Sequence, residues 1–157
     1  MIGAGNRGAE VYGEWIRAHP DKLRITAVAD PIEARRKAVA ERHNVAQERQ
    51  YQTWEEAIAA GKLADVALIA TQDQAHTGPT LAALQTGYDV LLEKPMAHRL
   101  EDCVALVQAA ERSGRLLQIA HVLRYTEFYQ RLYQIVTSGE LGPVSYTHLT
   151  LPTNREV

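Results

Sequence analysis

The chain begins MIGAGNRG, and the glycine spacing in this stretch constrains the fold more than any other feature of the sequence. Gly3, Gly5 and Gly8 form a Gly-x-Gly-x-x-Gly run, which is typical of the turn between the first strand and first helix of a dinucleotide-binding sheet. The first glycine permits the tight turn, the second lets a diphosphate approach the backbone, and the third lets the helix pack closely on the sheet. Phosphates would then meet the N–H groups at the helix N-terminus, with Asn6 and Arg7 beside them.

Only Met1 and Ile2 precede this motif, although such a turn should follow a full buried strand. The sequence therefore predicts that the first strand is cut short. We expect its loss to expose the edge of the neighbouring strand, to leave the glycine loop loosely held and to weaken cofactor binding. A glycine-rich turn without any ligand is the alternative, because the motif alone is weak evidence.

Apolar runs of strand length alternate with amphipathic helices along the chain. This alternation predicts an α/β fold with a doubly wound parallel sheet of the Rossmann type. Thr53 and Glu56 have the spacing of a capping box for one short helix. The expected strands are residues 23–30, 65–71, 89–95 and 116–122. The first three expected helices run from the glycines to His19, over residues 33–43, and after Thr53. The last three end at Gly87, at Gly114 after passing through Leu100, Val104 and Val107, and at Gly139 after passing through Phe128.

The overall composition is that of a globular protein with a small-molecule partner. The 157 residues suffice for one domain, and the net charge of −2 with interspersed signs provides no basic stripe for nucleic acid. No apolar run is long enough to span a membrane. Cys103 is the single cysteine, so no internal disulfide is possible and a packing role is expected. We expect a cytoplasmic protein without a metal site.

Asp30 ends the apolar run LRITAVAD, 22 residues after Gly8. This spacing is close to the one at which a carboxylate binds the adenosine ribose hydroxyls of a dinucleotide. A solvated turn-forming residue before Pro31 is the alternative. A carboxylate here would repel a 2′-phosphate, so NAD is favoured over NADP, but Arg35 and Arg36 are close enough in sequence to leave NADP open.

Polar side chains follow three later strands. Ligands of open parallel sheets bind at the carboxyl ends of the strands, so these side chains are candidates for a site. Taken singly, each has an ordinary structural alternative: a helix cap for the first pair, a surface charge for the lysine, and a buried core histidine in the third group. The candidates are Thr71 and His76 in ATQDQAH, Glu93, Lys94 and Pro95 in LLEKPMA, and His121, Arg124 and Tyr125 in AHVLRY.

Together these motifs resemble the Gfo/Idh/MocA family, from residue 1 to about Val144. The resemblance rests on GAGNRG, the strand ending in AD-P, ATxxxxH, GYDVLLEKPMA, and HxLRY followed by SGELGPV. It implies an N-terminal NAD(P)-binding domain, followed by an α/β domain that binds a sugar or polyol and builds a homo-oligomer. Residues 1–143 would form the first domain.

The family resemblance also implies roles for the candidate residues. Lys94 would be the catalytic residue, with Glu93 and Pro95 fixing its direction. Thr71 and His76 would flank the cofactor, while the group His121, Arg124 and Tyr125 would face the substrate domain.

The C-terminal stretch departs from the family pattern, because residues 144–157 stand where a substrate domain would begin. VSYTHLTLPT resembles a translated sequencing adaptor, so we interpret this tail as non-native sequence. The family's general acid/base would then lie outside the chain, and we expect negligible turnover. Two further hypotheses remain beside the oxidoreductase: an NAD-dependent glycosidase that acts through transient oxidation, and a non-catalytic nucleotide-binding protein.

Overall fold

The computed structural model describes residues 1–143, which fall into two compact units. The first unit is Met1–Ala120, and the second begins at His121. The second unit contains a short 3₁₀ helix, η4 (Val122–Tyr125), and the amphipathic helix α6 (Glu127–Thr137). The tail predicted to be non-native lies outside the described residues.

The first unit is built on parallel strands, which confirms the predicted α/β class. Strands β1 (Val28–Ala29) and β2 (Gln50–Tyr51) form one pair, and β3 (Val66–Ile69), β4 (Asp89–Leu92) and β5 (Leu117–Ile119) pair in that order. Ile2 joins the two groups through parallel bridges to Ala29 and Ile69. The resulting order, β2-β1-Ile2-β3-β4-β5, places the start of the chain at the centre of the sheet.

Residues 1–3, from which the glycine loop starts, are hydrogen-bonded to both neighbouring strands, because even a short extended segment can continue a ladder. The expectation of a loosely held loop is therefore wrong for these first residues. Four backbone hydrogen bonds of 2.8–2.9 Å make these connections: Ile2 N–H to Leu68, Ala70 N–H to Ile2, Ala29 N–H to Met1, and Gly3 N–H to Ala29. Weak cofactor binding stays a prediction.

The strand expected over residues 23–30 is shorter than its apolar run. Its ladder contains only Val28 and Ala29, and the amino group of Met1 donates a 2.8 Å hydrogen bond to the Ala27 carbonyl. Pairing with the segment 1–3 reaches no further back than this bond. The sequence pattern records burial, whereas a strand also requires a paired partner.

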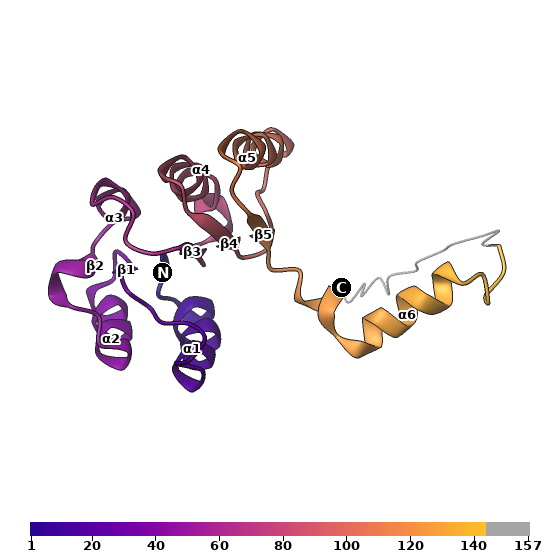
Figure 1. The fold of residues 1–157 in the computed structure, drawn as a ribbon, viewed down its shortest axis with the longest axis horizontal. Helices are drawn as coiled ribbons and strands as arrows, with labels where there is room; N and C mark the ends of the chain where they lie inside the picture. The colour runs from indigo at the N-terminus through magenta and orange to yellow at the C-terminus, as the bar shows by residue number, and fades with distance from the viewer. Residues whose placement is uncertain (144–157) are drawn as a thin grey trace, which may run out of the picture. The chain divides into compact units, whose positions relative to one another are not determined.

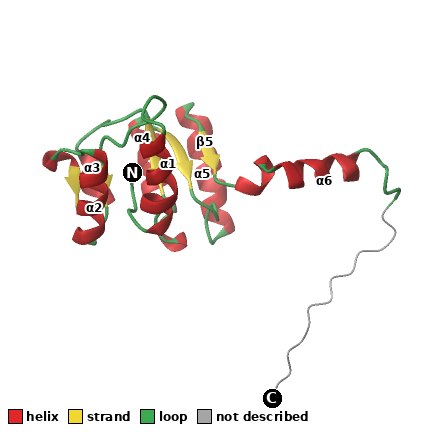
Figure 2. Cartoon of the chain, turned by 90° about the horizontal axis from the view of Figure 1, so that it is seen from below, coloured by secondary structure: helices red, strands yellow, loops and turns green. Residues whose placement is uncertain are grey.

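Helices cover both faces of the sheet (Figure 1). The π-helix η1 (Asn6–Gly13), α1 (Glu14–Ala18) and α2 (Glu33–His43) lie on one face, and α3 (Trp54–Ala59), α4 (Thr77–Thr86) and α5 (Leu100–Ser113) lie on the other. Figure 2 shows strands lying between helices of this unit. Short 3₁₀ turns, η2 (Gln47–Arg49) and η3 (Asp73–Ala75), precede β2 and α4.

The helix ends largely follow the predicted local chemistry. The Thr53 side chain accepts the Glu56 N–H and the Glu56 carboxylate accepts the Thr53 N–H, which confirms the capping box. Gly87 and Gly114 adopt left-handed conformations directly after α4 and α5, which favours glycine at those positions.

Two apolar clusters fill the spaces between the sheet and its helices. Burying such side chains is the main favourable contribution to folding, at about 25 cal/mol per Å² of apolar surface. One cluster includes Ile2, Ile69, Leu84, Leu92 and Leu106, and the other includes Ala4, Ile25, Val28, Val39 and Val45. The chain start therefore contributes to the core on both sides of the sheet.

The apolar residues that marked the helix before Gly114 do not face the core. Leu100 is 78% exposed, and Val104 and Val107 are also exposed, while Leu106 and Ala109 are buried. The helix itself is confirmed, but its buried face is made by other residues.

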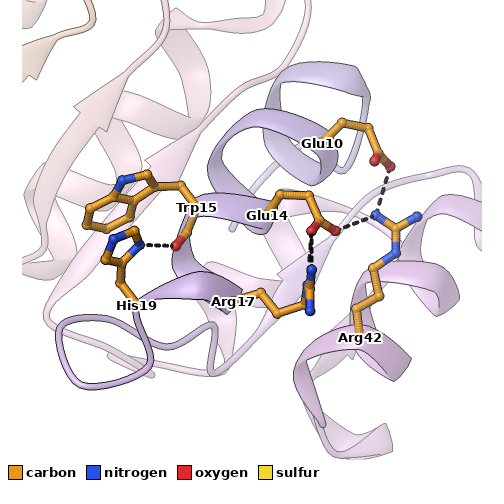
Figure 3. Close-up of polar contacts among 6 residues, drawn as sticks. All are labelled: Glu10, Glu14, Trp15, Arg17, His19 and Arg42. Atoms are coloured by element: carbon orange, nitrogen blue, oxygen red, sulfur yellow. Dashed lines mark hydrogen bonds and ion pairs between the residues drawn. The ribbon is translucent and has the colours of Figure 1, made fainter.

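A surface network connects η1 and α1 to α2 (Figure 3). Arg42 of α2 lies 2.8 Å from the Glu10 carboxylate and 3.4 Å from that of Glu14, and Arg17 also pairs with Glu14 at 2.8 Å. Trp15 stacks on His19 beside this network. The ion pairs are solvent-exposed, so each contributes little to stability, on the order of 0–1 kcal/mol.

Candidate functional site

A cavity of about 600 Å³ lies at the carboxyl ends of β1, β3 and β4. Its volume falls within the range of small-molecule sites in proteins. Eight of the residues predicted from the sequence line it: Gly3, Gly5, Asn6, Arg7, Asp30, Thr71, Glu93 and Lys94. The structure therefore brings the glycine loop, the end of β1 and the lysine turn to one edge of the sheet.

The three glycines leave room for a ligand at one position only. Gly3 has φ +91°, and a Cβ there would lie 2.6 Å from the Ala70 carbonyl oxygen. A Cβ on Gly8 would overlap the Gly3 carbonyl oxygen, which agrees with a close-packing role, and Gly8 does not line the cavity. A Cβ on Gly5 would meet nothing closer than Nη1 of Arg35, at 3.9 Å. The backbone at Gly5 is thus open to the cavity, as a diphosphate requires.

Asp30 is a buried structural anchor as well as a cavity residue. It is only 5% exposed, so the alternative of a solvated turn-forming residue is wrong. Its Oδ2 accepts the Ala4 N–H at 2.7 Å and its Oδ1 accepts the Ile32 N–H at 2.8 Å. Because Ala4 lies within the glycine loop, this carboxylate holds the loop against the turn after β1.

Glu93 is a second buried carboxylate, at the turn after β4. It is 5% exposed, and its Oε2 accepts the N–H of Lys94 at 3.0 Å. Its Oε1 accepts a 2.8 Å hydrogen bond from the Tyr12 hydroxyl and lies 3.8 Å from Nε of Arg7. Burial, supported by the bond to Glu93, raises the pKa of Tyr12 to about 12. Glu93 therefore connects the helix after the glycine loop with the backbone of the lysine.

No sequence motif identifies Tyr12 as a site residue. Tyr12 and Ile16 are four residues apart, which is helical spacing, and this is the only signal in the sequence. That spacing predicts a side facing the sheet but does not identify a partner 81 residues away.

His76 connects two segments of the site from behind the cavity. Its side chain is fully buried and does not line the cavity, and its expected place beside the cofactor stays a prediction. Its Nδ1 lies 2.7 Å from the Pro95 carbonyl oxygen and its Nε2 lies 3.2 Å from that of Thr71. The ring thereby links the turn after β3 to the turn that contains Lys94. Pro95 itself does not line the cavity.

Lys94 is exposed at the cavity wall. Within residues 1–143 its ammonium group makes no hydrogen bond or ion pair, whereas its backbone N–H is fixed by Glu93. The charge is therefore free to contact a ligand in the cavity.

The predicted substrate-side residues belong to the second compact unit. His121, Arg124 and Tyr125 are exposed and lie in or next to η4. Their role stays a prediction.

Further cavity residues come from α2 and α3. The sequence marks Arg35 as a residue that leaves NADP open, whereas no motif marks Ile32 or Trp54 as a site residue. Ile32 and Arg35 lie at the start of α2, and Trp54 opens α3 directly after its capping box. An aromatic residue next to a helix cap was the only available signal for Trp54.

Residues 1–143 contain no cluster with the composition of a metal centre and no membrane-spanning helix. No group of three or more His, Cys, Asp or Glu side chains there could hold a metal ion. No helix in this part of the chain is long and apolar enough to cross a membrane.

The fold and the site together define a Rossmann dinucleotide-binding domain. Its features are a doubly wound parallel sheet, a glycine loop, an aspartate at the end of β1, and a cavity at the carboxyl ends of the strands. The chain belongs to the Gfo/Idh/MocA oxidoreductase family, whose NAD-binding Rossmann fold matches residues 1–121. The predicted family and fold are therefore confirmed.

Individual relatives support the same assignment. The chain is 28% identical over 150 residues to the 2,7-anhydro-N-acetylneuraminate hydratase of Escherichia coli, covering 94% of this chain and 38% of that protein. It is 31% identical over 143 residues to an inositol 2-dehydrogenase of Corynebacterium glutamicum, covering 90% and 41%. The chain thus spans about two fifths of the length of these relatives.

A solved structure also matches the fold of this chain. The WlbA dehydrogenase of Chromobacterium violaceum, solved with NADH and UDP-GlcNAcA, superposes with a TM-score of 0.81 at 26% identity. The match covers 90% of this chain and 39% of the dehydrogenase.

Proposed function

We propose that this chain is the cofactor-binding part of an NAD(P)-dependent oxidoreductase that acts on a secondary alcohol of a sugar, polyol or derivative. The observation that carries the proposal is that one cavity is lined by the open backbone of Gly5, by Asp30 and by Lys94, whose ammonium group has no partner within residues 1–143. The inositol dehydrogenase and the WlbA complex among its relatives support a substrate of the sugar or polyol class.

The glycine loop and Asp30 would hold the dinucleotide. Backbone N–H groups at the start of η1, which has no side-chain cap, are available for the diphosphate, and Arg7 lines the cavity beside them. Asp30 has lone pairs beyond the two that its N–H partners use, and these would accept the ribose hydroxyls. A nicotinamide ring bound in this cavity supplies a hydride acceptor or donor.

Lys94 would contact the reacting hydroxyl. Its ammonium donates a hydrogen bond and stabilises the negative charge that develops on the oxygen as hydride leaves carbon. Glu93 and His76 would act as positioning residues, because they hold the backbone atoms on either side of this lysine. A general acid/base outside the described residues would take the proton.

A second candidate is a reaction without net oxidation. The hydratase among the relatives favours it, because the hydration of a substrate leaves its overall oxidation state unchanged. Such an enzyme would be an NAD-dependent glycosidase, which oxidises its substrate transiently and reduces it again before release. Cofactor that stays bound, with product formed and no net NADH, would identify it.

Cofactor binding by the 157-residue chain tests the first step of the proposal. Trp54 lines the cavity, so bound NADH should quench tryptophan emission by energy transfer. ADP should reverse the quenching by competing for the same loop. Saturable binding supports the proposal, and a lack of binding at millimolar NADH would instead favour a protein that uses this fold for another purpose.

The role of Lys94 is testable in a protein that joins this chain to a substrate-binding domain. Lys94→Met should lower kcat about 100-fold or more, the typical loss when one donor to a developing oxyanion is removed. NADH affinity should stay nearly unchanged. Lys62→Met, which removes an exposed lysine outside the cavity lining, is the matched control. Normal turnover by the Lys94 variant would support a non-catalytic function instead.

A further inference from the structure

Helix α5 is apolar on two sides, and only one of them is covered within residues 1–143. Leu106 and Ala109 are buried in the core, whereas Leu100, Val104 and Val107 are exposed. A helix that is apolar on more than one side is typical of an element that packs against neighbours on each of those sides. The exposed side of α5 therefore indicates a second contact.

This exposed side, the α5 stripe, consists of Leu100, Cys103, Val104 and Val107, which recur every three or four residues and so share one side of the helix. Leu100 is largely exposed at the start of the helix. Cys103, Val104 and Val107, together with Gln108, line a surface depression of about 360 Å³. The stripe thus has a projecting side chain at one end and a hollow toward the other.

The place of α5 in the fold leaves this stripe accessible. Strand β5 ends the strand order of the sheet, and α5 lies at this end of the first unit (Figure 1). Among the helices of that unit, α4 is its neighbour. The α5 stripe faces away from the core that α4 and α5 share, and it lies far from the residues that line the cofactor cavity.

Charged residues of opposite sign border the two ends of the α5 stripe. Arg99 precedes the helix and pairs with the exposed Glu101 at 3.2 Å. Glu111 lies in the last turn, where a negative charge opposes the helix dipole, and it makes no ion pair within residues 1–143. An apolar centre with a charged rim is the usual composition of a protein interface.

We infer that the α5 stripe binds a second copy of this chain, with the two α5 helices antiparallel around a two-fold axis that passes between Cys103 and Val104. A two-fold interface requires a patch that is complementary to itself. In this register Leu100 of each copy lies opposite Val107 of the other, so that each leucine enters the hollow. The side chains of Cys103 and Val104 lie close to those of the same residues in the second copy.

The antiparallel arrangement also suits the charges at the ends of the stripe. It brings Glu111 of each copy toward Arg99 and the positive end of the helix dipole in the other. A parallel pair would instead place like charges side by side. The inference does not depend on the proposed function, because it concerns a surface outside the cofactor cavity.

Sedimentation equilibrium of the 157-residue chain provides the first test. One helix stripe is smaller than the roughly 800 Å² per partner of a standard interface, so we expect monomers at about 1 μM and mostly dimers at about 1 mM. A chain that remains monomeric at about 1 mM would overturn the inference.

Charge exchange at Val104 tests the register. Val104→Glu and Val104→Lys should each weaken dimerisation at least about tenfold, because like charges then meet at the axis. An equimolar mixture of the two variants should dimerise again, and high salt should diminish this recovery. Recovery in the mixture also excludes a folding defect. If each variant alone dimerises as the wild-type chain does, the inference is refuted.

Val136→Glu, at an exposed valine of α6, is the matched control and should leave dimerisation unchanged. If this variant is monomeric while Val104→Glu is not, α6 forms the interface and the inference is wrong. Cys103 is the one cysteine of the chain, so a short bifunctional maleimide should link two copies through it. A dimer that gives no such cross-link would contradict the two-fold register.

Discussion

The hydroxyl of Tyr12 donates a 2.8 Å hydrogen bond to Oε1 of Glu93, across 81 residues of sequence. Tyr12 lies on the helix that follows the glycine loop, and Glu93 holds the backbone N–H of Lys94. The buried carboxylate of Glu93 thus connects the helix after the glycine loop with the turn that contains Lys94.

Tyr12→Phe should destabilise the protein without disturbing its packing. The change leaves one oxygen of a buried carboxylate without its nearest donor, so we expect the free energy of unfolding to fall by about 1–3 kcal/mol. Urea denaturation measures this loss. Tyr133→Phe, at a tyrosine that is 70% exposed, is the control and should have little effect. Equal stability of the two variants would contradict a structural role for the bond.

In a 157-residue polypeptide that begins at Met1, the amino group of this residue should make stability depend on pH. Burial lowers its pKa from 8.0 to about 5, so between these values the unfolded chain carries a proton that the folded chain does not. The free energy of unfolding should therefore fall as the pH decreases from 8 to 5 and level off below 5, by up to roughly 4 kcal/mol.

Chemical acetylation of this amino group isolates the effect. An acetylated chain has no charge to bury, and its amide N–H can still donate to the Ala27 carbonyl. The comparison is needed because burial also lowers the pKa of His43, which adds a dependence of the same sign. If the urea midpoints of the two forms follow the same pH curve, the amino group is not buried as described.

Alanine at Gly5 and at Gly8 should have opposite consequences. Gly5 has φ −75° and an open Cβ position, so Gly5→Ala should change stability by no more than about 0.5 kcal/mol. Its methyl group would occupy the approach to the backbone, and NADH affinity should fall at least about tenfold. Gly8→Ala would force a methyl group onto the Gly3 carbonyl and should cost about 3 kcal/mol or more.

Urea denaturation and NADH titration of both glycine variants check this pair of outcomes. If Gly5→Ala binds NADH as tightly as the wild-type chain does, the diphosphate does not lie against the backbone of Gly5.

His76 should stabilise the fold through its contact with the Pro95 carbonyl oxygen, which is the nearer of its two carbonyl neighbours at 2.7 Å from Nδ1. His76→Leu removes the donor of that oxygen, and we expect a loss of about 1–3 kcal/mol. His76→Asn should recover part of it, because its amide nitrogen lies near the place of Nδ1. His98→Leu, at an exposed histidine, is the control. Thermal unfolding that ranks the two leucine variants equally would refute the linking role.

The sequence alone determined the class of fold and the edge of the sheet at which the candidate site lies. Glycine spacing, capping residues and hydrophobic periodicity are consequences of local backbone geometry, so they can be read without knowing any contact. The same logic explains why the acidic residue at the end of β1 and the lysine after β4 were both predicted to lie near the glycines.

Only the tertiary structure decided which atoms those residues meet. Strand β2 has two residues and no local pattern, and it exists because its backbone pairs with β1. The two residues before Gly3 looked too few for a strand, yet they bond on both sides because β1 and β3 supply partners. Asp30 and Glu93 likewise gained their buried donors from distant segments, and such contacts depend on how the chain packs rather than on any spacing along it.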